Sequence, residues 1–156
     1  MVVATLAVAL AAAPAHAQYE PKTMMGDGYK DRTLAANRWE VKTWTISLSG
    51  MTADDMAFYR AAILAKAAGF SHVKIVKGRF TIVIAGGMSR RRGEIIAVGT
   101  NSAADIIPCE DRKRNENCTF LSVDSTIALL APRLEQTPAD VARDLAQTRE
   151  AGRRKD

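Results

Sequence analysis

Stretches in which apolar and polar residues alternate predict several β-strands in this chain. The first strand is predicted to begin at Arg38 and to end at Ser49-Gly50. Its apolar residues lie at odd-numbered positions up to Val41 and at even-numbered positions from Trp44 onward. Because a change of apolar face within one strand is typical of an inserted residue, we expect a bulge near Thr43.

A helical pattern follows this strand. Thr52 is a candidate N-cap, Asp55 lies near the positive end of the helix dipole, and Gly69 is suited to end the helix. The sequence therefore predicts a helix from Ala53 to Ala68, with one apolar face packed on the sheet. The apolar residues at helical spacing are Met56, Tyr59, Ile63 and Ala67.

The middle of the chain predicts a hairpin. Residues 73–84 alternate around Gly78, which favours one long strand bent at this glycine over the alternative of two strands. Gly86-Gly87 and the following residues 88–93 are predicted to form a turn with a basic tip, and Glu94 to Thr100 to form the returning strand.

The last third of the chain predicts one more strand and one more helix. Residues 101–118 show no regular pattern, and Phe120 to Leu130 is predicted to be a strand. Thr137-Pro138 is typical of a helix start, with Thr as N-cap and Pro at the first position. The basic residues within 149–155 suit the C-terminal end of this helix.

The order of these elements is typical of an α+β fold, a mostly antiparallel sheet with helices packed on one face. We expect one domain over residues 26–150. The 139 residues that remain without the first 17 are enough to bury about 68% of the unfolded surface. A flexible polar segment is expected over 18–25 and a basic frayed tail over 151–156. The other face of the sheet is left as a candidate partner surface.

The first 17 residues carry no charge and end in Ala15-His16-Ala17. An apolar run closed by small residues predicts a secretory signal peptide cleaved at about Ala17, and therefore a periplasmic or secreted protein. A disordered apolar tail and a buried first helix are the alternatives. The run is shorter than the ~20 residues of a membrane-spanning helix, so we expect no transmembrane anchor.

The two cysteines, Cys109 and Cys118, enclose the wholly polar segment EDRKRNEN. In an exported protein this arrangement predicts a structural disulfide. By lowering the entropy of the unfolded chain, it would stabilise the protein by about 2.5 to 3 kcal/mol. A metal site or a redox dithiol is the alternative. The spacing does not match C-x-x-C, and His72 is the only histidine left after cleavage, so we expect no metal and no cofactor.

The charge of the chain favours an anionic partner. With 22 basic and 17 acidic residues the net charge is +5, which suits lipid headgroups, envelope phosphates or nucleic acid. Aromatic residues are not interleaved with the basic runs, which disfavours nucleic acid. Arg90, Arg91 and Arg92 are the candidate anion-binding residues, because adjacent guanidinium groups suit bidentate phosphate recognition. Their alternative role is to keep a solvated hairpin tip from aggregating.

Catalytic chemistry has little support in the sequence. His72 lies at the start of a predicted strand and has no nucleophile motif beside it. We expect no catalytic residues, although a carboxylate-based site stays open. The candidate carboxylates are Glu40, Asp54, Asp55, Glu94 and Asp105.

Three short motifs occur in order over about residues 26–76. They are a Gly-Tyr pair at Tyr29, Asn37-Arg38 followed by Trp39, and Tyr59-Arg60-Ala61-Ala62 with a Gly69-Phe70 ending. These motifs resemble a family of small envelope proteins of alphaproteobacteria, often described as lipoproteins. The resemblance implies an envelope location and no assigned reaction. The chain lacks the lipid-attachment cysteine of the lipoprotein members. We expect these motif residues to be structural.

Arg60 lies mid-helix among apolar residues, which predicts a structural ion pair with Asp31 or Glu40. Taken together, these patterns favour a non-catalytic binding or structural module of the cell envelope that acts on an envelope macromolecule. The alternatives are a carboxylate-based envelope hydrolase and an anion-binding module that uses Arg90–Arg92.

Overall fold

The computed structural model describes residues 19, 21, 28–46, 53–85, 88–105, 107, 110 and 118–154. The predicted signal peptide over residues 1–17 lies outside the described residues. The described part of the chain forms one antiparallel sheet and three helices.

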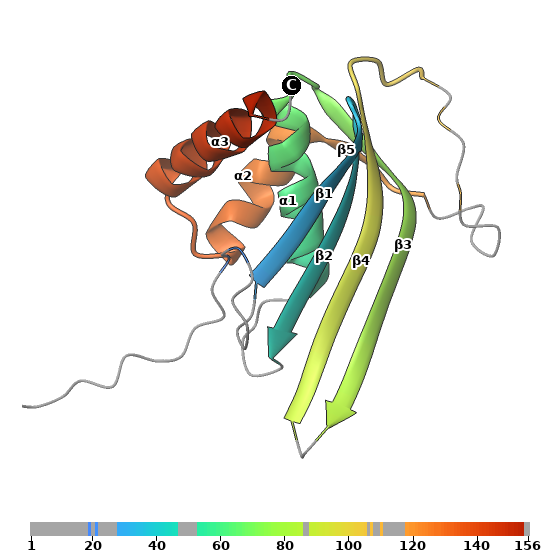
Figure 1. The fold of residues 1–156 in the computed structure, drawn as a ribbon, viewed down its shortest axis with the longest axis vertical. Coiled ribbons are helices and arrows are strands. Elements are labelled where there is room, and N and C mark those ends of the chain that lie inside the picture. Colours follow the sequence, from blue (N-terminus) through green and yellow to red (C-terminus); the bar gives the residue numbers. More distant parts are fainter. Residues whose placement is uncertain are drawn as a thin grey trace, which may run out of the picture.

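The sheet has the strand order β1-β2-β4-β3-β5, and all four strand pairs are antiparallel (Figure 1). Its strands are β1 (Gly28–Ala35), β2 (Arg38–Ile46), β3 (His72–Ala85), β4 (Met88–Thr100) and β5 (Phe120–Ser122). β5 pairs only with His72 to Lys74 of β3. The remainder of β3 therefore has β4 as its only partner strand among the described residues.

All three helices lie on one side of the sheet (Figure 1). They are α1 (Ala53–Ala67), α2 (Val123–Arg133) and α3 (Pro138–Arg153). α1 packs on β2, β3 and β4, while α2 and α3 pack on α1. This arrangement confirms the predicted α+β fold with a mostly antiparallel sheet and helices on one face.

α1 begins and ends as the sequence predicts, within one residue. Gly69 adopts a φ of 88°, which favours glycine, and its N–H donates to Lys66 O while the next N–H, from Phe70, donates to Ala65 O. The apolar side of α1 is wider than expected, because Ala53 and every residue from Asp55 to Ala65 except Phe58 is buried. The outer turns are covered by α2 and α3.

The bulge expected near Thr43 is wrong. β2 pairs in unbroken register with both β1 and β4 across this position. Thr43 and Thr45 continue the buried face begun by Trp39 and Val41, and the Thr43 hydroxyl donates to Ala53 O at 2.7 Å. Two inward threonines therefore replace the apolar residues that the pattern required.

The strand predicted over Phe120 to Leu130 is also wrong. Only Phe120–Ser122 pairs with β3, and the chain then enters α2 at Val123. The buried residues of α2 and its C-cap follow the helical period, and Leu129 is 65% exposed. They are Val123, Thr126, Ile127, Leu130, Ala131 and Leu134. A short apolar run fits the period of a strand or that of a helix. Here the packing of α2 against α1 favours the helix.

The predicted hairpin forms, with a different place for its arginines. β3 is one continuous strand, as predicted, and its register shift lies between Ile75 and Lys77 rather than at Gly78. Residues 90–92 do not form a turn. They lie within β4, where each is paired with both β2 and β3.

Two structural features were not expected from the sequence. β1 is a strand with a register shift between Thr33 and Ala35, although most of its side chains are exposed. Tyr19, within the segment expected to be flexible, is 7% exposed, and Pro21 forms an isolated bridge with Tyr29. The Tyr19 ring packs against Tyr29 of β1 and Tyr59 of α1.

Replacing Thr137 with alanine should destabilise the domain by about 1 kcal/mol, because it removes the N-cap of α3. The Thr137 hydroxyl accepts from Asp140 N at 3.2 Å, and the Asp140 carboxylate accepts from Thr137 N at 3.0 Å. Hydrogen bonds from the Thr137 side chain and backbone lower the pKa of Asp140. Denaturant unfolding measures the change, and an unchanged midpoint would contradict this role for the cap.

Candidate functional site

The face of the sheet opposite the helices, which we call the open face, is strongly basic. Side chains alternate along each strand, so the register assigns them to faces. The basic residues on the open face are Lys30, Arg32, Arg38, Lys42, Lys74, Lys77, Arg79, Arg90 and Arg92. The strands place only Glu40 and Glu94 there as acidic residues among those described. The open face therefore carries more positive charge than the whole chain, whose net charge is +5.

A ladder of ion pairs crosses part of the open face. Glu40 pairs with Arg32 at 3.4 Å and with Lys42 at 3.4 Å. Glu94 pairs with Lys42 at 3.2 Å and with Arg92 at 3.4 Å. These two glutamates, both in the predicted set of carboxylates, are brought together by Lys42, which lies between them. Each acid is shared by two cations, so the ladder stays net positive.

Arg90 and Arg92 belong to the open face, and Arg91 does not. Arg91 is paired with Thr45 of β2 and so points to the side of the sheet on which the helices lie. The Arg92 guanidinium lies 5.8 Å from the centre of the Trp44 ring, within the range of a cation–π contact. The three arginines expected to act as one group are therefore divided between two faces.

The second candidate site is a buried cluster around Arg60. Its guanidinium donates to Asp31 at 2.6 Å, to Asp144 at 2.8 Å and to Thr148 at 3.0 Å, and its side chain is 7% exposed. Asp31 was one of the two expected partners. The other, Glu40, lies on the open face and is not a partner. Asp144 and Thr148, both on α3, were not foreseen.

Three tyrosines enclose this cluster. Tyr19 stacks on Tyr29 with ring centres 4.8 Å apart and meets Tyr59 edge-on at 4.7 Å, and its hydroxyl donates to Asp144 at 3.1 Å. Burial raises the pKa of Tyr29 to about 12 and raises the pKa of Tyr19 and Tyr59 as well. Burial alone would lower the pKa of Arg60, but the surrounding tyrosines and aspartates raise it, so the guanidinium stays charged.

Alkaline titration should report on this cluster alone, because these are the only tyrosines of the chain. The unfolded tyrosines lose their protons near pH 10.0 while the folded ones keep theirs, so stability is complete below that pH and is lost as pH rises through the raised values. We expect tyrosinate absorbance to appear together with loss of circular dichroism. Full ionisation of all three in a folded protein near pH 10.0 would contradict the burial.

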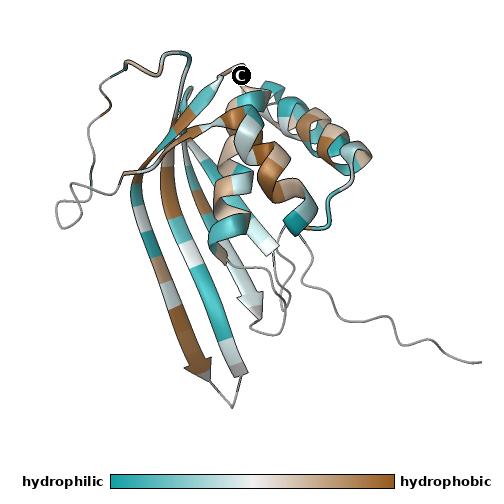
Figure 2. Ribbon diagram, turned by 180° about the vertical axis from the view of Figure 1, so that it is seen from behind, coloured by the Kyte–Doolittle hydropathy of each residue, from teal (hydrophilic) through white to brown (hydrophobic). Residues whose placement is uncertain are grey.

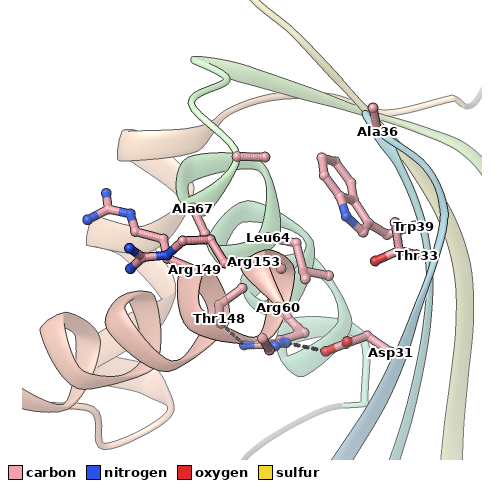
Figure 3. Close-up of a pocket in the computed structure, with 13 residues that line it drawn as sticks. Asp31, Thr33, Ala36, Trp39, Arg60, Leu64, Ala67, Thr148, Arg149 and Arg153 are labelled. Atoms are coloured by element: carbon pink, nitrogen blue, oxygen red, sulfur yellow. Dashed lines mark hydrogen bonds and ion pairs between the residues drawn. The ribbon is translucent and has the colours of Figure 1, made fainter. Parts of the chain in front are cut away.

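A cleft of about 500 Å³ lies beside the cluster, between β1, β2, α1 and α3. Figure 3 shows Arg60 and Asp31 in contact at its base and Trp39 and Leu64 along its wall, while Arg149 and Arg153 project away from Trp39. A second opening of about 450 Å³ brings Asp31 and Asp144 together. Both carboxylates are engaged by the same guanidinium, so neither is a free acid or base.

The remaining predicted carboxylates do not converge. Asp54 and Asp55 lie at the start of α1, where burial raises the pKa of Asp54 and Asp55 pairs with Arg133 at 2.9 Å. Asp105 is hydrogen-bonded to the Thr100 hydroxyl. No three His, Cys, Asp or Glu side chains cluster as metal ligands within the described residues.

His72 has structural contacts. Its Nδ1 lies 2.9 Å from the Ser71 hydroxyl, and its ring stacks on Phe120 of β5 at 5.1 Å. None of the candidate carboxylates is recorded in contact with it in the described part of the chain. This setting is that of a partly exposed strand residue, as the sequence predicts.

The motif residues fall in structural positions. Tyr29, Tyr59 and Arg60 form the buried cluster, and Gly69 ends α1. The Asn37 side chain donates to Gly99 O at 3.2 Å. Arg38 pairs with Glu110 at 2.5 Å.

Cys118 lies beside β3, with its Sγ 3.3 Å from Val76 O. Cys109 lies outside the described residues, so the disulfide between them stays a prediction. None of the described helices combines the length and apolar character that crossing a bilayer requires.

Comparison with known proteins gives no further assignment. No protein family model, no curated protein and no solved structure matches this chain. The resemblance to small alphaproteobacterial envelope proteins therefore stays a prediction.

Proposed function

We propose that the protein is a non-catalytic binding module of the cell envelope, and that the open face binds phosphate groups on an anionic surface or polymer. The observation that carries the proposal is the excess of nine basic residues over three acidic ones on one face of the sheet, with Glu110, which pairs with Arg38, counted beside Glu40 and Glu94. Such a concentration of charge attracts anions over several ångströms and accelerates encounter.

The arrangement of the cations supports binding to an extended anion. Lys30, Lys77, Arg79 and Arg90 are exposed and form no ion pair with another described residue. They come from β1, β3 and β4, so they span the width of the sheet. Guanidinium groups can hold phosphate oxygens through two hydrogen bonds.

A carboxylate-based hydrolase has less support. General acid–base catalysis needs one carboxyl group that can give a proton and another that can take it. Asp31 and Asp144 share one arginine, and Glu40 and Glu94 share one lysine. A cation therefore lies between the members of each pair and engages both carboxylates.

The location in the envelope is part of the proposal and rests on sequence. The uncharged run over residues 1–17 supports export, and the polar segment between Cys109 and Cys118 suits an oxidising compartment. The resemblance over residues 26–76 also supports a location in the cell envelope.

The test is the salt dependence of binding to inorganic polyphosphate, measured by titration calorimetry with the form that begins at Gln18. The logarithm of the association constant should fall linearly with the logarithm of the salt concentration, because bound phosphates release counterions. Binding that is absent, or that is unchanged between low and high salt, would reject the proposal.

A further inference from the structure

The end of the β3–β4 hairpin, defined as residues 80–85 and 88–93, exposes three consecutive apolar side chains. Ile82, Val83 and Ile84 are 62%, 51% and 78% exposed. The ten residues from Phe80 to Ser89 include no charged residue. Exposed edge strands usually carry lysine or proline as protection against pairing, and residues 80–85 of β3 contain neither.

The apolar side chains lie on both faces of the hairpin end. Ile82 and Ile84 are paired with Arg91 and Ser89 and point to the helix side, while Val83 is paired with Arg90 and points to the open side. In Figure 1 this end of the hairpin extends past the ends of β1, β2 and the helices. Figure 2 shows the end of β3 in brown beside a teal stretch of β4. Apolar side chains on both faces can be buried at the same time by an apolar medium that contacts both faces of the hairpin end.

Three arginines lie just behind the apolar end. β4 pairs them with β3 as Arg90 with Val83, Arg91 with Ile82 and Arg92 with Thr81. At about 3.4 Å per residue, all three lie within roughly 10 Å of the Ile84–Ser89 pair. Their alternation puts Arg90 and Arg92 on one face and Arg91 on the other, so cations surround the strand pair.

We propose that the hairpin end inserts into the boundary between headgroups and acyl chains of an anionic bilayer. Ile82, Val83 and Ile84 enter the apolar side, and Arg90, Arg91 and Arg92 bind lipid phosphates. Interfacial elements bury their apolar residues about 5 to 10 Å deep with cations at the headgroup level, which matches this spacing. The inference rests on the proposed function, since it names the source of the phosphates that the open face binds.

A second protein strand is the competing occupant of the free β3 edge. Strand addition would use the backbone of β3 and would cover the edge, but it would leave Val83 on one face and Ile82 and Ile84 on the other without a new apolar environment. It would also leave the arginines without anions. The distribution of both kinds of side chain around the hairpin favours lipid.

The experiment compares Ile82→Ser/Ile84→Ser with wild type and with Leu34→Ser/Leu129→Ser, which removes exposed apolar side chains elsewhere. Each protein is titrated with inorganic polyphosphate and with vesicles of phosphatidylglycerol and phosphatidylcholine in equal amounts. The hairpin variant should bind the vesicles on the order of 100-fold more weakly, because two isoleucines no longer enter lipid. Its binding to polyphosphate should be unchanged, and the control variant should behave as wild type in both titrations.

Two results would overturn the inference and leave the proposed function in place, provided that wild type binds polyphosphate. One is vesicle binding by the hairpin variant that equals wild type. The other is a lipid-free wild-type dimer in sedimentation velocity that the hairpin variant dissociates, which would assign the edge to a second copy. Failure of wild type to bind polyphosphate would reject the proposed function itself.

Discussion

Replacing Arg60 with alanine is expected to lower the free energy of unfolding by about 3 to 5 kcal/mol, the usual cost of removing one member of a buried ion pair. The side chains of Arg60, Asp31 and Asp144 are 7%, 21% and 12% exposed. Without the guanidinium, two carboxylates would remain near one another and largely out of water. A loss of this size is a large part of the total stability of a small domain.

The effect should extend beyond the ion pairs. Arg60 lies 4.4 Å from the centre of the Tyr29 ring and joins β1 to α3 through Asp31 and Asp144. The contact between α3 and the rest of the domain therefore depends on this residue. We expect proteolysis of the Arg60→Ala protein to begin within α3.

The measurement is denaturant unfolding of Arg60→Ala beside Arg143→Ala, a matched control. Arg143 forms an exposed pair with Asp140, so its loss should cost about 0 to 1 kcal/mol. Arg60→Lys should fall between the two, because lysine keeps the charge and loses the planar fork. Equal stability of the two alanine variants would contradict the structural role of the buried cluster.

Neutralising three open-face arginines is expected to weaken polyphosphate binding on the order of 100-fold at low salt, at about 1 kcal/mol for each lost cation. The variant is Arg79→Gln/Arg90→Gln/Arg92→Gln, and glutamine avoids placing new negative charge beside Glu94. The slope of the salt dependence should fall by about three, one for each lost phosphate contact.

The matched control removes the same charge from α3. Arg143→Gln/Arg149→Gln/Arg153→Gln changes exposed residues on the helix side of the molecule, two of which line the cleft near Trp39. This control should bind polyphosphate nearly as wild type does. If it loses more affinity than the open-face variant, the binding surface lies on α3 and the account of the open face is wrong.

Local signals in the sequence were sufficient to predict two of the helices, α1 and α3. Gly69 requires a positive φ at the end of α1, and Thr137-Pro138 supplies a cap and a pre-set first turn for α3. Both signals act over a few residues. Elements with such ends could be predicted within about one or two residues, as is usual for helix boundaries.

The wrong predictions fall at positions where tertiary packing, and not the local sequence, determines the secondary structure. Thr43 is polar in the pattern, yet its hydroxyl is satisfied by Ala53 O, so the strand needs no bulge to keep its buried face. The apolar run after Phe120 fits a strand or a helix, and its contacts with α1 favour the helix. Neither contact can be inferred from neighbouring residues.

The candidate sites likewise combine features that local sequence signals predict with features that they do not. Asp144 is 84 residues from Arg60 along the chain, so no local pattern joins them. One signal was available: Asp144 and Thr148 are four residues apart and therefore lie on one face of the predicted last helix. The basic open face needed the strand register, because it combines residues of two hairpins, β1–β2 and β3–β4, that are far apart in sequence.

Amide chemical-shift mapping during titration with inorganic polyphosphate tests the central claim most directly, because it locates the bound anion. The account predicts that the largest shifts fall in β1, β2, β3 and β4 around the cations of the open face, with Lys30, Lys77, Arg79 and Arg90 among them. It also predicts little change in α3. Shifts concentrated at Arg149, Arg153 and Trp39, with the four strands otherwise unchanged, would contradict it.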